Sequence, residues 1–248
     1  MSYQQRPQYS YQPPQRNFSW FNRLKEPPLK NILIVVGILL AIFLAIRSPR
    51  FGASLIILLV AFPVHELAHA WTAYKLGDAT PKYDGRLTLN PFAHLDLFGS
   101  LLILTAGLGW AKPVRFNPSA LRMDPRMGAM IVAAAGPISN LILAVIGAVV
   151  WNVISPLLGV AGLSAGQTIG NLVFFFVLIN VALFFFNLIP LAPLDGFTVL
   201  RGLLPYQLAY QLDRIQPYSI IIFLVLFILG VLGPLIFWPA ERITYLLL

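Results

Sequence analysis

Long apolar runs limit this chain to a structure built around a lipid bilayer. An α-helix of about 20 apolar residues crosses the hydrocarbon core of a membrane. The chain has 248 residues, of which 58% are hydrophobic and only 10% charged, too apolar a composition for a soluble domain. We therefore expect an all-α polytopic membrane protein with about five full transmembrane helices. The expected spans are residues 31–46, 51–73, 128–151, 170–190 and 217–238.

The remaining segments are expected to be shorter or irregular. Residues 97–110 are apolar but short and interrupted by glycine, which favours a re-entrant segment over a full span. Residues 86–89 and 112–116 are predicted to form short β-strands at the cytosolic membrane surface. Residues 1–28 are rich in Gln, Pro, Tyr and Arg, a composition typical of a disordered tail. We expect this cytosolic tail to precede one domain at 29–248, with its core at 51–205.

The basic residues predict how the chain is oriented. The net charge is +8, and Lys and Arg concentrate in the cytosolic loops of membrane proteins. If residues 97–110 are re-entrant, all of the 17 Lys and Arg except Arg47, Arg50 and Arg242 face the cytosol. A full crossing would instead place the basic loop at 112–126 outside. We therefore expect a cytosolic N-terminus, and this bias explains the charge without a nucleic-acid partner.

The second apolar run contains the sequence His65-Glu66-Leu-Ala-His69. Residues i and i+4 of an α-helix lie on one face, so the two imidazoles can share one zinc ion with an open coordination position. Glu66 is then placed to act as a general base towards a water molecule. Ionisable side chains inside a bilayer are costly unless they have partners, which argues against a chance match. We expect one Zn²⁺ per chain, with Glu66 as the catalytic residue.

A third zinc ligand is expected from Asp195, which follows the fourth apolar run and precedes Gly196. A turn residue in an Asp-Gly pair is the alternative interpretation. The span 51–73 and the span 170–190 end on the same side of the membrane only if residues 97–110 are re-entrant. The ligand prediction and the topology prediction therefore depend on each other, and together they place the active site near the cytosolic side.

Two asparagines are candidates for binding substrate or stabilising an oxyanion. Asn187 ends the fourth run, where its amide can hold an extended peptide or, alternatively, cap the helix. Asn140 lies in Gly136-Pro137-Ile-Ser-Asn140, where contact between helices is the alternative to contact with substrate. His94 is expected to make a local hydrogen bond in a loop. The phenylalanines at 174–176 and 184–186 are expected to face lipid or pack between helices.

Two other functions fit intramembrane histidines and carboxylates. A membrane metal transporter also places such groups in a bilayer, along the path of the ion. A non-cleaving module that binds transmembrane helices would keep the architecture without the chemistry. Glu66 distinguishes these functions from a protease, because only hydrolysis needs its basic carboxylate.

Several segments together resemble the site-2 protease family of intramembrane zinc metalloproteases. They occur in the family's order over roughly residues 51–205, which makes the resemblance far more specific than the His-Glu-x-x-His motif alone. The chain is most similar to the compact prokaryotic branch without a PDZ or CBS domain. The segments are His65–His69, Gly85–Pro91 with His94 and Asp96, Gly109–Val114, Gly136–Asn140 and Asn187–Gly196.

The resemblance implies regulated intramembrane proteolysis, in which a single-pass transmembrane protein is cut within the lipid bilayer. It also implies zinc ligation by His65, His69 and Asp195, with Glu66 as the base. In the family, the position of Asn187 is linked to substrate engagement.

Overall fold

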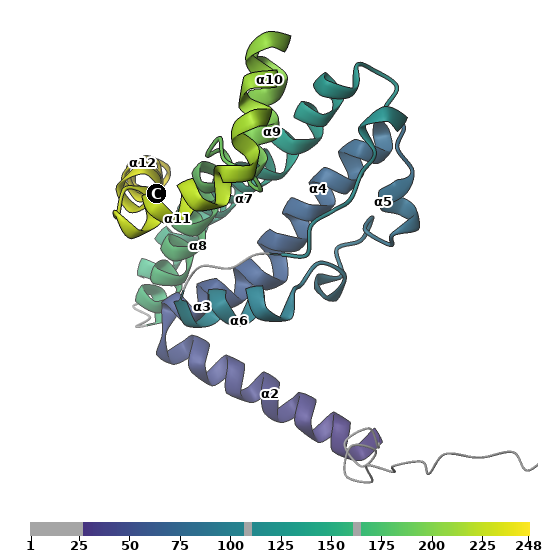
Figure 1. Ribbon diagram of the computed structural model, residues 1–248. Coiled ribbons are helices and arrows are strands. Elements are labelled where there is room, and N and C mark those ends of the chain that lie inside the picture. Colours follow the sequence, from purple (N-terminus) through teal and green to yellow (C-terminus); the bar gives the residue numbers. More distant parts are fainter. Residues whose placement is uncertain (1–26, 107–110, 161–164) are drawn as a thin grey trace, which may run out of the picture. The chain divides into compact units, whose positions relative to one another are not determined.

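The computed structural model describes residues 27–106, 111–160 and 165–248, which form helices joined by short connections (Figure 1). The described part contains no β-strand. Its only β-type backbone pairing is an isolated antiparallel bridge between Leu95 and Ala111. The α-helices are α2 (Pro27–Arg47), α3 (Pro49–Ile56), α4 (Phe62–Lys75), α5 (Thr80–Tyr83), α6 (Leu97–Ala106), α7 (Pro125–Val160), α8 (Ala165–Asn187), α9 (Asp195–Leu203), α10 (Tyr206–Ile215), α11 (Ser219–Ile228) and α12 (Leu232–Leu247). A π-helical segment, η1 (Ile57–Ala61), joins α3 to α4, and three 3₁₀ turns are η2 (Pro91–Ala93), η3 (Pro118–Ala120) and η4 (Gln216–Tyr218).

The structure divides between residues 43 and 44 into two units, which we describe separately. The first unit contains most of α2, a single helix that includes the expected first span at 31–46. Its described side chains are almost all exposed. Residues 1–26, which make up nearly all of the expected tail, lie outside the described residues.

Four helical segments of the described chain are long and apolar enough to cross a membrane. They cover Arg50–Lys75, Pro125–Leu157, Gly166–Asn187 and Tyr206–Ile228. The first three contain most or all of the expected spans at 51–73, 128–151 and 170–190. The protein is therefore a multi-pass, all-helical membrane protein. Helix α7 extends to Val160, beyond its expected end at residue 151.

The predicted span at 217–238 is wrong as one continuous helix. Helix α11 ends at Ile228, and α12 begins only at Leu232. Gly230 lies between them with φ +71, in the left-handed region that favours glycine. The Gly230 N–H donates to the Phe227 carbonyl and the Val231 N–H to the Leu226 carbonyl, so this turn satisfies the end of α11.

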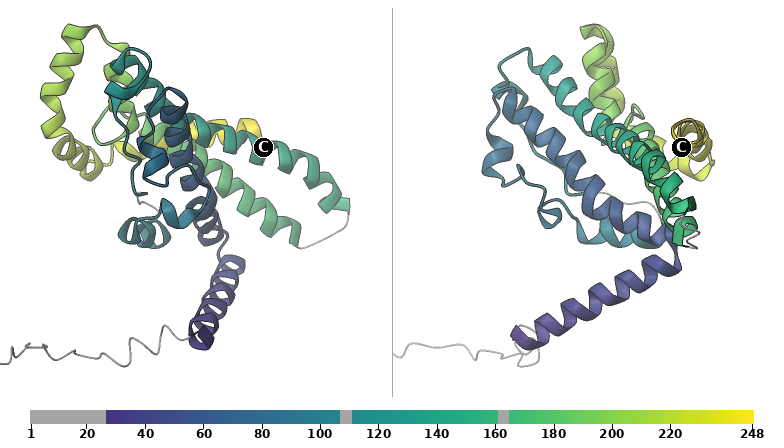
Figure 2. Two further views of the ribbon diagram at one scale, coloured as in Figure 1. Left: turned by 90° about the vertical axis from the view of Figure 1, so that its right-hand side faces the viewer. Right: turned by 180° about the vertical axis from the view of Figure 1, so that it is seen from behind.

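The core of the second unit forms where α7 packs along α8, with α12 on the other side of α8 (Figures 1 and 2). Alanine and valine line the α7–α8 contact, including Ala144, Ala148, Val177 and Val181, and all four are buried. Such small side chains let two membrane helices approach closely. Helix α4 packs against α7, and α9 also contacts α7, so α7 supports both elements that carry the predicted zinc ligands.

The predicted strands at 86–89 and 112–116 are not formed, although both stretches are described. Several backbone groups of residues 112–117 are bonded to the surrounding loops and helices instead of to a neighbouring strand. The Lys112 N–H donates to the His94 carbonyl at 2.7 Å, and the Asn117 N–H donates to the Asp78 carboxylate at 2.6 Å. Alternating apolar residues predict extended backbone, but they do not show which groups receive its hydrogen bonds.

Candidate metal centre

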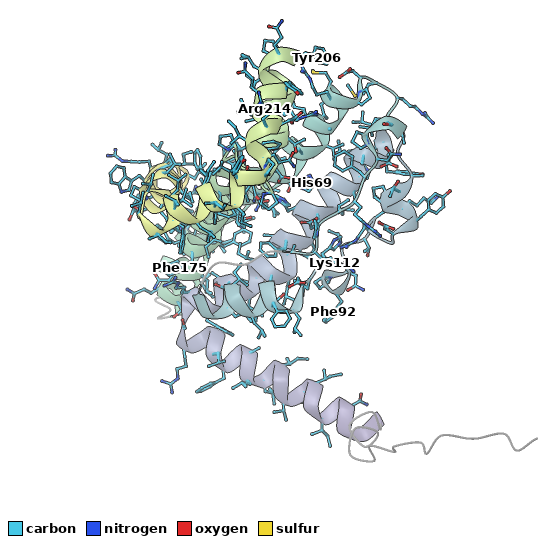
Figure 3. All side chains as sticks on the ribbon, in the orientation of Figure 1. His69, Phe92, Lys112, Phe175, Tyr206 and Arg214 are labelled. Carbon is cyan, nitrogen blue, oxygen red and sulfur yellow. The ribbon has the colours of Figure 1, made fainter. Side chains whose placement is uncertain are left out.

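The His-Glu-x-x-His motif lies on α4, within a helical segment that runs without interruption from α3 through η1. The side-chain hydroxyl of Ser48 accepts a hydrogen bond from the Phe51 N–H and caps the start of this segment. His65, Glu66 and His69 are all buried, with 9%, 7% and 8% of their surface exposed. Figure 3 marks His69 on α4, in the interior of the second unit. The three motif side chains therefore face protein.

The structure brings Asp195 to the two histidines. Asp195 is the first residue of α9, and its Oδ2 atom lies 3.3 Å from both the His65 Nε2 and the His69 Nε2 atoms. The two Nε2 atoms are 3.0 Å apart. A tetrahedral zinc ion with bonds of about 2.0–2.1 Å separates its ligand atoms by about 3.3 Å. The triangle of donor atoms is therefore the right size for one face of a zinc site.

The hydrogen bonds of the two rings fix their tautomers. The Nδ1 atom of His65 lies 2.7 Å from the Asn140 Oδ1 atom, and the Nδ1 atom of His69 lies 2.7 Å from the Val132 carbonyl oxygen. Because both partners are acceptors, each neutral ring carries its proton on Nδ1 and a lone pair on Nε2. Two lone pairs and a carboxylate oxygen that converge in this way would repel one another unless a metal ion or a proton lies between them. The donor set fits zinc.

Helix α7 covers the back of the site, and it can do so because residue 136 is glycine. A Cβ atom at Gly136 would lie 2.3 Å from the His69 Nε2 atom and 2.6 Å from the His65 Nε2 atom. Any side chain there would displace the rings. One turn further on, Asn140 is fully buried and bonds His65. The sequence Gly136–Asn140 thus leaves room for the two imidazole rings and holds one of them by a hydrogen bond.

Glu66 has a partner from a distant loop. Its Oε2 atom accepts a hydrogen bond of 3.0 Å from the Val114 N–H, which belongs to the irregular segment 112–117. One carboxylate oxygen is therefore held by backbone. Sequence reasoning missed Val114, because every residue except proline carries a backbone N–H and its identity gives no signal.

The other candidates have local partners. The Asn187 amide donates to the Leu183 carbonyl at 3.0 Å, within its own helix α8. His94 is fully buried and its Nε2 atom bonds the Thr88 carbonyl at 2.8 Å, the local hydrogen bond expected for it. Among the phenylalanines, Phe176, Phe185 and Phe186 pack against the core around α8. Asn140, predicted to bind substrate or to contact another helix, bonds His65 on α4.

Comparison with known proteins identifies a matching family and several relatives. The family described as "Peptidase family M50" matches residues 150–230, which include Asn187 and Asp195. "Putative zinc metalloprotease YwhC" of Bacillus subtilis is 45% identical over 185 residues, covering 74% of this chain and 83% of that protein. "Putative zinc metalloprotease Rip2" of Mycolicibacterium smegmatis is 30% identical over 193 residues, covering 73% of this chain and 70% of that protein. Solved structures gave no match.

Fold, site and relatives together define a membrane metalloprotease that uses zinc. The chain belongs to peptidase family M50, the site-2 protease family. The resemblance found in the sequence is therefore confirmed.

Proposed function

We propose that this protein is an intramembrane zinc metalloendopeptidase that hydrolyses peptide bonds within or next to the transmembrane segments of single-pass membrane proteins. The observation that carries this proposal is the convergence of His65, His69 and Asp195, whose ligand atoms all lie within 4.8 Å of one another beside a buried Glu66. These groups lie on and beside helices that can span a bilayer. Such a position suits a substrate that is itself a membrane helix.

In the proposed mechanism, His65 and His69 would hold zinc through Nε2, and Asp195 would hold it through a carboxylate oxygen. A bound zinc ion would supply Lewis acidity, which polarises a carbonyl and lowers the pKa of a water molecule. Glu66 takes the proton from the attacking water and returns it to the leaving amine. Asn140 and Val132 keep the two imidazoles oriented through their Nδ1 atoms.

The proposed topology has a cytosolic N-terminus, a re-entrant segment at 97–110 and an active site near the cytosolic side. The Leu95–Ala111 bridge supports the re-entrant segment, since it joins the two ends of that stretch. A chain that leaves and returns to the same point has not crossed to the opposite face. Residues 107–110 lie outside the described residues.

The substrate must lose helical structure before it can be cut, because a transmembrane helix hides its peptide bonds in its own hydrogen bonds. We propose that Asn187 contacts the unwound substrate. It is the last residue of α8 and precedes the loop that leads to Asp195.

The test is co-expression with candidate single-pass membrane proteins, followed by zinc analysis of the purified enzyme. We expect Glu66→Gln to keep its zinc and lose cleavage by roughly 10²–10⁴-fold, the usual contribution of a general base. Glu241→Gln is the matched control, because Glu241 is exposed on α12, and it should cleave normally.

Two results would contradict the proposal. If Glu66→Gln cleaves at the wild-type rate, Glu66 is not the general base of the reaction. Zinc flux in liposomes that persists in Glu66→Gln, without cleavage of any membrane protein by the wild type, would favour the metal transporter.

A further inference from the structure

Arg86 is a buried cation that the proposed mechanism does not use. Only 6% of its surface is exposed, and it forms no ion pair with a carboxylate of the described residues. A buried charge without a counter-charge costs several kcal/mol unless many hydrogen bonds compensate for it. Its position in the fold therefore needs an explanation.

The hydrogen bonds from Arg86 to the described residues go to backbone carbonyls at one place. Its Nη1 atom donates to the Ala93 carbonyl at 2.6 Å and to the Lys112 carbonyl at 3.2 Å, and its Nη2 atom donates to the Pro113 carbonyl at 3.4 Å. Ala93 precedes the apolar stretch 97–110, and Lys112 and Pro113 follow it. The guanidinium thus ties together the two chain segments that flank this stretch, beside the Leu95–Ala111 bridge.

The segment that Arg86 holds is also the segment that holds Glu66. We call residues 112–117 the strap. Val114, the residue after Pro113, donates its N–H to the Glu66 Oε2 atom. At the other end of the strap, the Asn117 N–H donates a hydrogen bond to the Asp78 carboxylate. The Val114 hydrogen bond uses one lone pair of Oε2 and restrains the orientation of the Glu66 carboxylate. The position of the strap therefore influences where the carboxylate points.

We propose that Arg86 is a positioning residue for the reaction, which fixes the strap so that Val114 N–H orients the carboxylate of Glu66. The inference rests on the proposed function of Glu66 as the base. The guanidinium suits this task because it offers several donors in one rigid plane and reaches three carbonyls at once. A lysine at this position would keep the charge but bring one flexible donor group.

The experiment compares purified full-length wild type, Arg86→Lys and Arg86→Gln in detergent. Arg115→Gln is the control, because Arg115 lies on the same strap but its side chain is 81% exposed and pairs with Asp84. Three quantities are measured: amide hydrogen exchange of residues 112–117, bound zinc, and kcat and KM for a substrate that the wild type cleaves.

We expect the strap amides, Val114 included, to exchange faster in Arg86→Gln than in the wild type, with an intermediate rate in Arg86→Lys. We expect zinc to stay at the wild-type level and KM to change little. We expect kcat to fall by roughly tenfold to a hundredfold, the scale for a catalytic group displaced by about 1 Å. Arg115→Gln should match the wild type in all three measurements.

The proposal is overturned if Arg86→Gln exchanges like the wild type, or if its strap exchanges faster while kcat is unchanged. A loss of bound zinc together with a fall in kcat in both Arg86 variants would also overturn it, because Arg86 would then act only by stabilising the fold. If the wild type cleaves nothing, the proposed function fails, whereas the exchange comparison still decides whether Arg86 holds the strap.

Discussion

The amide of Asn140 illustrates how one buried residue can control a metal site that it does not touch. Its Oδ1 atom accepts the Nδ1 proton of His65 at 2.7 Å, which leaves the Nε2 lone pair facing Asp195 and His69. Partners of this kind typically change metal affinity by 10–100-fold. Asn140 is thus a determinant of zinc binding in the proposed site.

We predict that Asn140→Ala binds zinc about 10–100-fold more weakly, because His65 loses the acceptor that fixes its tautomer. Competition with a chelator measures this affinity. Asn140→Asp keeps an acceptor oxygen and should retain most of the affinity. Asn152→Ala is the control on the same helix, because Asn152 is exposed and bonds the Leu247 carbonyl, away from the zinc ligands. Equal affinities in Asn140→Ala and the wild type would contradict this role.

At the scale of residues, the sequence predicted what local spacing can determine. The pairing of His65 with His69 follows from the geometry of one helix turn. Asp195 had to be placed through topology, since it is far from the motif in sequence. Arg86 and Val114 were not identified as functional, because their roles depend on which backbone groups the folded loops bring within reach.

At the scale of elements, the connection after α4 depends on Asp78. This side chain is almost fully buried and accepts hydrogen bonds from the Thr80 N–H, the Thr80 hydroxyl and the Asn117 N–H at 2.6–2.9 Å. Burial by itself would raise the pKa of Asp78, but these hydrogen bonds outweigh it and hold the pKa below its ordinary value. Asp78 therefore stabilises the fold in its ionised form.

We predict that Asp78→Asn lowers the Tm at neutral pH by a few degrees, at roughly 2–4 °C for each kcal/mol lost in a chain of this size. Because the folded pKa is depressed, this stabilisation is present above the unfolded pKa of about 3.9 and disappears as the pH falls through the folded pKa. The difference between the two proteins should be constant from about pH 7 to 5 and shrink below about pH 4. Thermal unfolding across this range, with Asp84→Asn as a control, measures it. A Tm difference that grows as the pH falls would contradict this prediction.

The elements that sequence reasoning placed incorrectly have two causes. Hydropathy indicates which residues are apolar, but not where a short polar or glycine signal interrupts a helix. Gly230 is enough to separate α11 from α12 inside an apolar stretch. The predicted strand at 112–116 is absent for a different reason, because the partners of these residues are a histidine carbonyl and the side chains of Arg86, Glu66 and Asp84.

At the scale of the molecule, the proposed orientation can be tested cleanly because the chain contains no cysteine. We predict that a single cysteine at Arg50 reacts with a membrane-impermeant thiol reagent added outside intact cells, whereas a cysteine at Lys112 does not. Both positions are exposed on the structure, so both should react after the membrane is permeabilised. Labelling of Lys112→Cys in intact cells would mean that residues 97–110 cross the membrane.

The arrangement of the zinc ligands has a consequence for the lifetime of the protein. His65 and His69 come from α4 and Asp195 from the start of α9, and Arg201 on α9 pairs with Asp213 on α10. One ion would therefore act as a staple that ties the C-terminal helices to the first half of the molecule. We expect zinc starvation to loosen α9 and α10 and to make them more sensitive to cellular proteases, so that metal supply would control the abundance of this protein as well as its activity.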